Sequence, residues 1–408
     1  MNLSTTDLIN LAWVGLCAML VFFMQAGFAL VECGSARSKN SINVIMKNYT
    51  DMCVGAFAYW LVGYGLMFGA SAAGWLGTSD FALNTMNAST SMSWFYQVMF
   101  ASTAATIVSG AMAERMHFNA YLVSSTVMTL LIYPVYGHWA WNPNGWLKQI
   151  GFIDFAGSSV VHSVGAWCAL AGVIVLGPRL GRFTKTGEAH DIPGHNLPMV
   201  ALGGFILWLG WFGFNGGSVG GFDKDNVGLV LINTHMGGVA GVVGAIGWAM
   251  LTRRPVLMST TVNASLCGLV AVTAGAATLS PLTASLVGLI AGILFIYMAE
   301  FIRSRRIDDA VDAFAVHGVG GIWGTLAAGL FYSGDFFNVS RIGVQLLGIG
   351  AAFLWAFPVS YAMFKLIDKL MGLRASTMHE QRGLDYTEHN ELGYPEFQNS
   401  PAQLKMGE

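Results

Sequence analysis

Eleven long apolar runs most limit what this chain can fold into. They lie at about residues 8–31, 43–70, 94–113, 119–138, 155–177, 198–218, 228–251, 257–279, 282–302, 313–332 and 341–371. Each run is close to the roughly 20 residues that a helix needs to cross the hydrocarbon core of a bilayer. Only 10% of the residues are charged, against about 25% in soluble globular proteins. The sequence therefore predicts an all-α membrane protein with eleven transmembrane helices.

Lysine and arginine are unevenly distributed among the segments that join these runs. If the runs are successive crossings, one side of the membrane receives only Lys148, Lys224 and Arg341, and the other side receives the remaining basic residues. The side rich in lysine and arginine is normally cytoplasmic. We therefore expect a multi-pass protein of the plasma membrane (the inner membrane of a bacterium), with the N-terminus outside and the C-terminus in the cytoplasm.

One pattern occurs twice in the chain. A shift of 155 positions places Asp154 on Asp309 and His162 on His317, which is the signature of an internal repeat. In each copy the histidine follows the aspartate by eight residues, a rise of roughly 12 Å along a helix. Each imidazole is then expected near the middle of the membrane, where an ionisable residue suggests a functional site.

The two copies fall on the fifth and tenth predicted crossings, so they run in opposite directions. Inverted repeats with a site near the midplane are a transporter architecture. We expect repeats at about 8–177 and 198–332, with an eleventh helix at about 341–371 outside them. Together these form a transmembrane domain over 1–374, followed by a polar cytoplasmic tail at 375–408.

Aromatic residues and one hydroxyl gather near the predicted outer ends of several helices. They are Phe100, Trp141, Trp211, Phe214 and Ser218. Aromatic faces attract cations, by roughly 0.5 kcal/mol when exposed and about 2 kcal/mol when desolvated. The same residues also fit an interfacial aromatic belt with core packing, and spacing alone leaves both interpretations open.

Other polar residues in the runs have simpler interpretations. A membrane histidine can serve as a helix–helix hydrogen bond, and Asp309 and Asp312 can be helix N-caps. Glu32, at the inner end of the first run, is interpreted as a packing or interface residue. His235 is interpreted as structural, with an effect on affinity or conduction as the alternative. The five cysteines lie in apolar segments without a CxxC pair, so we expect no disulfide framework, no metal site and no cofactor.

Six stretches of the chain resemble the ammonium transporter family (the Amt/Mep/Rh superfamily, in its bacterial Amt form). They read GFALVECGSARSKN, ASTAATIVSGAMAER, IDFAGSSVVHSVGA, HNLPMVALGGFILWLGWFGFNGGS, VDAFAVHGVGGIWGTLAAGLF and GLDYTEHNELGYP. The resemblance covers nearly the whole chain. It implies eleven spans in two inverted halves, assembled as a homotrimer with one pore in each subunit.

The resemblance also implies roles for individual residues. Trp141 and Ser218 resemble an outer ammonium recruitment site with Phe100 beside it, and Phe100 with Phe214 resembles a phenylalanine gate. His162 and His317 resemble twin histidines that line the pore.

Two further residues complete this set. Asp154 resembles the aspartate that holds the site in shape through backbone N–H groups, and Trp211 resembles an aromatic wall of the pore.

The energetics of a dry pore favour a neutral species. Moving a bare ion into a dry interior costs tens of kcal/mol. Removing one proton at pH 7 from an amine with a lysine-like pKa of about 10.4 costs roughly 4–5 kcal/mol. We therefore expect deprotonation near the mouth and passage of ammonia. Each imidazole can donate and accept, so the pair is expected to relay the proton separately.

Several functions remain as alternatives. Within the family these are an ammonium sensor that signals to a fused or partner domain, and an Rh-type gas channel, which the Trp141 and Ser218 pattern disfavours. Outside it, His162 and His317 could be axial haem ligands on facing helices, or the chain could be a structural scaffold. The expected ligands are ammonium and its analogue methylammonium. The tail resembles a coupling segment for a PII-type regulatory protein, and no enzyme activity or nucleic-acid binding is expected.

Overall fold

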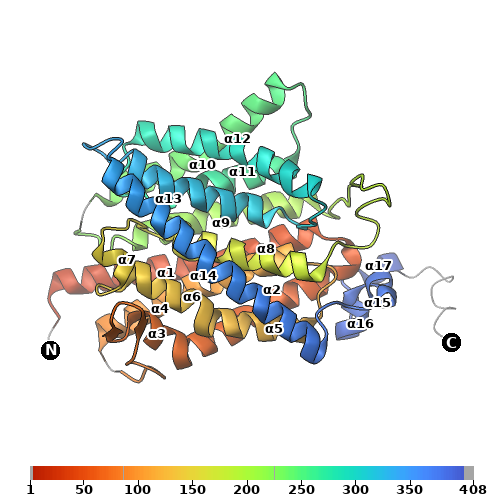
Figure 1. The fold of residues 1–408 in the computed structure, drawn as a ribbon, viewed down its shortest axis with the longest axis horizontal. Coiled ribbons are helices and arrows are strands. Elements are labelled where there is room, and N and C mark those ends of the chain that lie inside the picture. The colour runs from red at the N-terminus through yellow and green to blue at the C-terminus, as the bar shows by residue number, and fades with distance from the viewer. Residues whose placement is uncertain (1–2, 86, 225, 399–408) are drawn as a thin grey trace.

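The computed structural model describes residues 3–85, 87–224 and 226–398, and these are almost entirely helical (Figure 1). The long elements are α1 (Thr5–Ser35), α2 (Ser41–Ala58) continued by η2 (Tyr59–Gly63) and α3 (Tyr64–Phe68), α4 (Ala88–Ala111), α5 (Phe118–Val127) continued by η3 (Met128–Ile132) and α6 (Tyr133–Trp141), η4 (Ser158–Ser163) continued by α8 (Val164–Leu176), α9 (Leu197–Gly217), α10 (Val227–Leu251), α11 (Met258–Thr273), α12 (Pro281–Ser304), η5 (Phe314–Val319) continued by α13 (Gly320–Leu330), and α14 (Val339–Met371). Shorter elements are η1 (Ser38–Asn40), α7 (Trp146–Gln149), α15 (Thr377–Arg382), α16 (Leu384–His389), α17 (Pro395–Gln398) and the strand pair β1 (Ser71–Ala72) and β2 (Leu76–Gly77).

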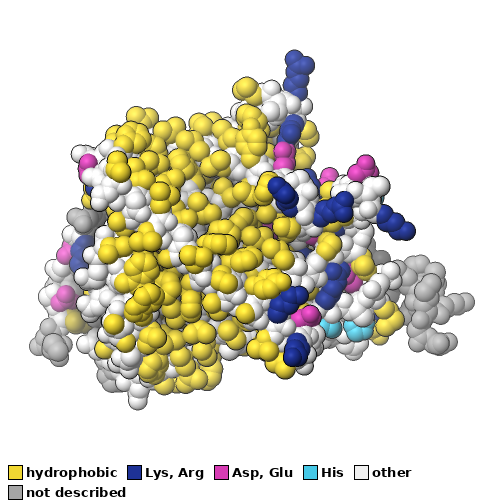
Figure 2. Space-filling model, in the orientation of Figure 1, with side chains coloured by type: hydrophobic (Ala, Val, Ile, Leu, Met, Phe, Trp, Pro, Cys, Tyr) yellow, Lys and Arg dark blue, Asp and Glu magenta, His cyan; other side chains and the backbone are white. Residues whose placement is uncertain are grey.

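A helical membrane architecture is confirmed. Each of the eleven predicted runs overlaps a helical element, and among the described residues eight helices are long and apolar enough to cross a bilayer. Two shorter apolar helices, α11 and the continuous η5–α13 segment, accompany them. Figure 2 shows a broad apolar belt, with Lys and Arg side chains gathered towards the end of the molecule where α15–α17 lie. These helices establish the class of fold, and the number of eleven crossings stays a prediction.

Helices α1 and α9 pack against each other backbone to backbone. A Cβ atom placed on Gly213 would meet the carbonyl oxygen of Cys17 at 2.7 Å, and one on Gly34 would meet that of Asn196 at 2.5 Å. The early part of α1 thus meets the late part of α9, so the two helices run antiparallel. Small residues at such seams permit the close approach that stabilises membrane helices.

The two copies of the sequence repeat share an unusual backbone. Each begins with a π-helix, η4 in the first copy and η5 in the second, and each π-helix contains the repeated histidine. Asp154 accepts a hydrogen bond from the N–H of Ser159 at 3.0 Å, and Asp309 accepts one from Phe314 at 2.7 Å. Both bonds join residues five positions apart, so the repeat extends to local geometry. The start of each segment packs beside the end of the other, so they pass in opposite directions.

The described part of the tail folds back onto the helical bundle. Helices α15 and α16 lie at the same end of the molecule as the start of α2 (Figure 1). Asp385 accepts a hydrogen bond from the N–H of Asn43 at 2.8 Å, and Lys39 donates to the carbonyl of Glu380 at 2.8 Å. The tail therefore docks instead of extending away, although residues 399–408 of the predicted tail lie outside the described residues.

Candidate functional site

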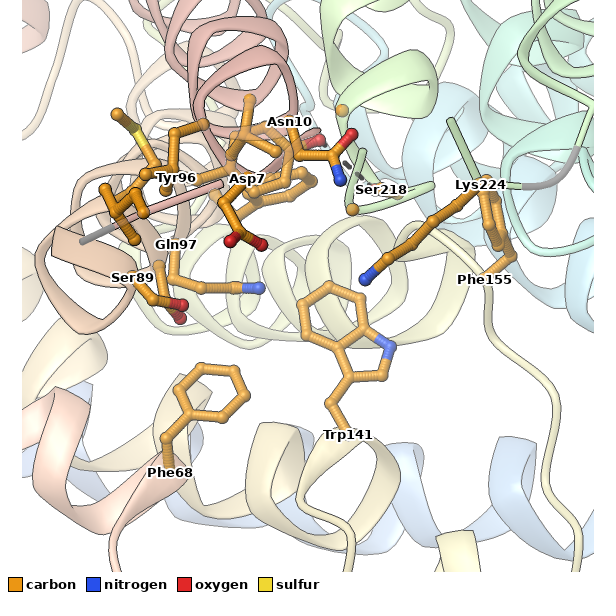
Figure 3. Close-up of a pocket in the computed structure, with 18 residues that line it drawn as sticks. Asp7, Asn10, Phe68, Ser89, Tyr96, Gln97, Trp141, Phe155, Ser218 and Lys224 are labelled. Atoms are coloured by element: carbon orange, nitrogen blue, oxygen red, sulfur yellow. Dashed lines mark hydrogen bonds between the residues drawn. The ribbon is translucent and has the colours of Figure 1, made fainter. Parts of the chain in front are cut away.

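A cavity of about 450 Å³ opens at the end of the molecule where α1 begins (Figure 3). We call it the vestibule. Three residues predicted for recruitment line it, namely Phe100 of α4, Trp141 of α6 and Ser218 after α9. The structure therefore brings these residues together from distant parts of the chain.

Trp141 is fixed in the vestibule by a hydrogen bond and an aromatic contact. Its indole Nε1 donates to the backbone carbonyl of Asp154 at 2.7 Å. Its ring lies edge-on to Phe100, with centroids 5.9 Å apart and planes at 87°. The nearby Trp139 points elsewhere, since its Nε1 donates to the carbonyl of Trp75 and its ring packs on Trp146. Trp141 is thus the tryptophan that faces the vestibule.

Ser218 belongs to a small hydroxyl cluster at the end of α9. Its Oγ donates to the carbonyl of Phe214 at 2.9 Å, and the hydroxyl of Tyr96 donates to the same carbonyl at 2.6 Å. The two hydroxyl oxygens lie 3.2 Å apart. When both hydroxyls donate to this carbonyl, as their distances to it permit, the oxygen lone pairs remain available to a cation. The sequence interpretation missed Tyr96, whose only signal was its position one helical turn before Phe100.

Two phenylalanine rings close the floor of the vestibule. Phe100 and Phe214 have ring centroids 4.1 Å apart and planes at 53°, and both side chains are buried. Phe100 lines the vestibule, whereas Phe214 also contacts His162 at 5.4 Å between ring centroids. The pair therefore separates the vestibule from the imidazole beneath it.

His162 and His317 meet in the centre of the bundle. Their Nδ1 atoms lie 3.2 Å apart and their rings are nearly parallel, at 14°. Trp211 stacks on His162 with centroids 5.1 Å apart, and its Nε1 donates to Thr273 Oγ1 at 2.9 Å, which fixes the indole. The direct contact between the imidazoles leaves no space for a macrocycle between them, which argues against the haem alternative.

The histidine contact also constrains the tautomers. A hydrogen bond between two Nδ1 atoms needs one donor and one acceptor, so one ring carries its proton on Nδ1 and the other on Nε2 when both are neutral. His162 Nε2 is buried and has no hydrogen-bond partner among the described residues. The pair can therefore pass a proton only by exchanging tautomers.

Asp154 holds the backbone beside the vestibule. Its carboxylate accepts hydrogen bonds from the N–H groups of Gly157 at 3.0 Å, Ser159 at 3.0 Å and Val160 at 2.8 Å. Gly157 has a φ of 112°, which lies in the left-handed region that favours glycine. The side chain thus secures the turn into η4, while the Asp154 carbonyl positions Trp141.

Some residues fall outside this path, and others join it unexpectedly. His235 is exposed on α10 and packs on Trp208 and Phe212, away from the vestibule. Asp7 and Lys224 point into the vestibule from opposite sides (Figure 3). The sequence marked Lys224 as one of three basic residues on the outer side but gave no sign that it faces the site.

The described residues hold no cluster of three or more His, Cys, Asp or Glu side chains that could bind a metal ion. An aromatic mouth above paired imidazoles, inside a helical bundle with an apolar belt, defines a membrane transport protein. A model of the Ammonium Transporter Family matches residues 12–394. The chain belongs to this family.

Similar proteins include several with the same overall extent. The chain is 40% identical to ammonium transporter Amt2 of Archaeoglobus fulgidus, over 98% of this chain and 91% of that protein. It is 43% identical to a putative ammonium transporter of Synechocystis, over 97% and 76% of the two chains. A solved structure described as a sensor Amt protein is 41% identical with a TM-score of 0.90, over 93% and 98%. Candida albicans Mep2 is 26% identical with a TM-score of 0.85, over 97% and 92%.

Proposed function

We propose that this protein is an ammonium transporter that recruits ammonium at the vestibule, removes its proton there and passes ammonia through the bundle. Methylammonium would serve as an analogue. The observation that carries the proposal is the position of His162 and His317, in direct contact beneath the closed rings of Phe100 and Phe214. Recruitment would involve the indole of Trp141 and the hydroxyl oxygen of Ser218.

Energetics support the division of ammonium into ammonia and a proton. The rings below the vestibule are apolar and closely packed, so a bare cation would lose its water there at a cost of tens of kcal/mol by Born estimates. Deprotonation at neutral pH costs only roughly 4–5 kcal/mol for an amine with a pKa near 10.4. Ammonia is therefore the species that passes, and the proton needs another route.

The histidine pair supplies that route. A proton delivered to one ring nitrogen can leave from the far nitrogen of the second ring, which exchanges the two tautomers. Trp211 and Phe214 cover His162 and exclude bulk water. We expect the ammonia and the proton to cross in the same cycle, so that transport carries net charge.

We further propose eleven membrane crossings in two inverted repeats at about 8–177 and 198–332, with α14 outside them. The antiparallel α1–α9 seam and the matched η4 and η5 segments support this symmetry. The vestibule would face outward and the docked tail the cytoplasm, in a bacterial inner membrane. We also propose a homotrimer and a PII-type partner at the tail, both of which the sequence resemblance implies.

One alternative has specific support. The similar structure with a TM-score of 0.90 is described as a sensor, so ammonium sensing through the same vestibule, with little or no conduction, is the second candidate function. Both functions need ammonium to bind, but only transport needs charge to move.

Currents from purified protein in proteoliposomes test the two functions. On a solid-supported membrane, ammonium and methylammonium should elicit currents that potassium does not. Replacing His162 and His317 together by leucine should abolish the current. An undiminished current in that double variant would overturn the relay, whereas ammonium binding without current in the unmodified protein would favour the sensor.

A further inference from the structure

A second, small cavity lies on the far side of the histidine pair from the vestibule. It has a volume of about 20 Å³, and its lining includes Phe28 and Glu32 of α1, Asn263 of α11 and His317. The vestibule is lined by Asp7 near the start of α1, whereas Glu32 lies near its end. The two cavities therefore lie at opposite ends of one path, with the imidazoles between them.

Glu32 is a carboxylate where none is expected from packing alone. It is 2% exposed, and its Oε2 accepts a hydrogen bond from Asn48 Nδ2 at 2.8 Å. Among the described residues no lysine or arginine forms an ion pair with it. Burial of a carboxylate without a cationic partner is costly within the membrane. Its hydrogen bonds from Asn48 and Ser109 could equally be accepted by a glutamine.

The charged groups nearest to Glu32 are engaged with other partners. Lys47 donates to the carbonyl of Met116 at 2.8 Å. Asp51 accepts hydrogen bonds from Tyr121 and from Thr106. Only Glu32 of these three charged side chains lines the cavity, which His317 also lines. The sequence interpretation of Glu32 as a packing residue did not anticipate this position.

The cavity has the size of one small molecule. A volume of about 20 Å³ exceeds the roughly 10–15 Å³ that one water needs. One ammonia or one water therefore fits in the cavity that Glu32 and His317 both line. Gly110 of α4 maintains the arrangement, since a Cβ there would meet Glu32 Cδ at 3.1 Å and Val311 Cγ2 at 2.7 Å.

We propose that Glu32 is the inner proton-exchange group of this pore, an inference that rests on the proposed transport function. Ammonia that has passed His317 takes the proton of the Glu32 carboxyl group. The O–H bond breaks, an N–H bond forms, and the products are ammonium and the Glu32 carboxylate. The proton carried by the histidine pair then passes from His317 to the carboxylate, which restores Glu32. The pair is left with its tautomers exchanged, so both rings must return to their first tautomers before the next proton is delivered from the vestibule. The new ammonium leaves towards the docked tail.

The test compares two buried carboxylates in the full-length protein in proteoliposomes. Glu32→Gln keeps the size and the acceptor for Asn48 but cannot exchange a proton. Asp51→Asn is the matched control, since Asp51 is equally buried but does not line the cavity. We expect Glu32→Gln to lower the ammonium current on the order of 10²-fold, at the low end of what a positioned proton-transfer group contributes. Asp51→Asn should retain most of the current, and Glu32→Asp should recover part of it.

Each outcome bears on the proposal. A normal current in Glu32→Gln, or equal losses in both variants, would overturn it, whereas no current in the unmodified protein would remove the transport function itself. Infrared difference spectra give a second readout that does not depend on the current. Addition of ammonium should change the carbonyl stretch of a protonated carboxyl group, and the change should persist in Asp51→Asn. Absence of that change would also overturn the role of Glu32.

Discussion

The hydroxyl of Tyr96 donates a hydrogen bond of 2.6 Å to the carbonyl of Phe214, so α4 and α9 are joined directly above the aromatic floor of the vestibule. The same hydroxyl lies 3.2 Å from Ser218 Oγ. One side chain thus aligns Phe214 and the hydroxyl of Ser218.

Tyr96→Phe should therefore weaken ammonium recruitment. Loss of a hydrogen bond worth about 1 kcal/mol should raise the half-saturating ammonium concentration roughly five-fold, with a smaller effect on the maximal current. Tyr59→Phe is the control, because the Tyr59 hydroxyl bonds to Met67 and neither residue lines the vestibule. Equal effects of the two substitutions would contradict this role of Tyr96. Concentration series of the transient current provide the measurement.

The symmetry-related aspartates should respond differently to loss of charge. Asp154→Asn weakens three backbone hydrogen bonds beside the carbonyl that holds Trp141. Displacement of Trp141 should raise the half-saturating concentration about ten-fold, equivalent to about 1.4 kcal/mol. Asp309→Asn changes the equivalent turn at η5, far from the vestibule, so it should lower thermal stability but leave that concentration unchanged. A similar rise of the half-saturating concentration in both variants would show that the Asp154 turn has no specific role in recruitment.

Lys224 should oppose recruitment by its positive charge. It points into the vestibule opposite Asp7 (Figure 3). Two unit charges several ångströms apart in water-like surroundings have an interaction energy of about 1 kcal/mol or less. Lys224→Gln should lower the half-saturating ammonium concentration roughly two- to five-fold at low salt. The difference should shrink at higher salt, since the screening length is about 10 Å at 0.1 M. Lys148→Gln, which removes an outer charge outside the vestibule, should have no such effect.

Asp308 should stabilise the fold in a pH-dependent way. Burial alone would raise its pKa, but hydrogen bonds from Arg179 and the charges of Arg115 and Arg179 hold the pKa well below its usual range. A lowered carboxyl pKa contributes stability that is complete above the unfolded value of about 3.9 and is lost as the pH falls towards the folded value. Asp308→Asn should cost about 3–5 kcal/mol at neutral pH, because the buried Arg179 and Arg182 lose the carboxylate that they share, and only Arg179 keeps a second buried partner, Glu114.

Thermal unfolding in detergent measures this effect. The difference between the unmodified protein and Asp308→Asn should be largest at neutral pH and should shrink below about pH 4. Glu300→Gln, which breaks the exposed pair with Arg254, should cost at most about 1 kcal/mol. An equal melting temperature for Asp308→Asn and the unmodified protein at neutral pH would show that the buried pair adds nothing.

The sequence was informative where periodicity or repetition determines geometry. The 155-residue shift of Asp154 and His162 predicted that two histidines would meet, and their Nδ1 atoms lie 3.2 Å apart. Apolar runs predicted the helices because a bilayer leaves few alternatives for the backbone. The roles of Trp141 and Ser218 came from family resemblance, since spacing alone could not separate a recruitment site from an aromatic belt.

Other parts of the site depend on geometry that no local pattern encodes. Glu32 was assigned to packing because a position near a helix end does not say which face meets the pore. The π-helices η2, η3, η4 and η5 interrupt the 3.6-residue period, so helical-wheel reasoning fails to predict the residues that follow them. Lys224 lies in a turn-rich connection, where tertiary contacts determine the direction of the side chain.

The seam between α1 and α9 limits how this protein can move. Two helices that touch along their peptide backbones cannot slide or tilt apart without breaking contact at several glycines at once. Rocking of one half against the other is therefore a poor description of the cycle. For the proposed transport function we therefore expect the helical frame to stay fixed while the side chains of Phe100 and Phe214 rotate to admit the solute. The turnover rate should then depend on how often the side chains of Phe100 and Phe214 rotate out of the path of the solute.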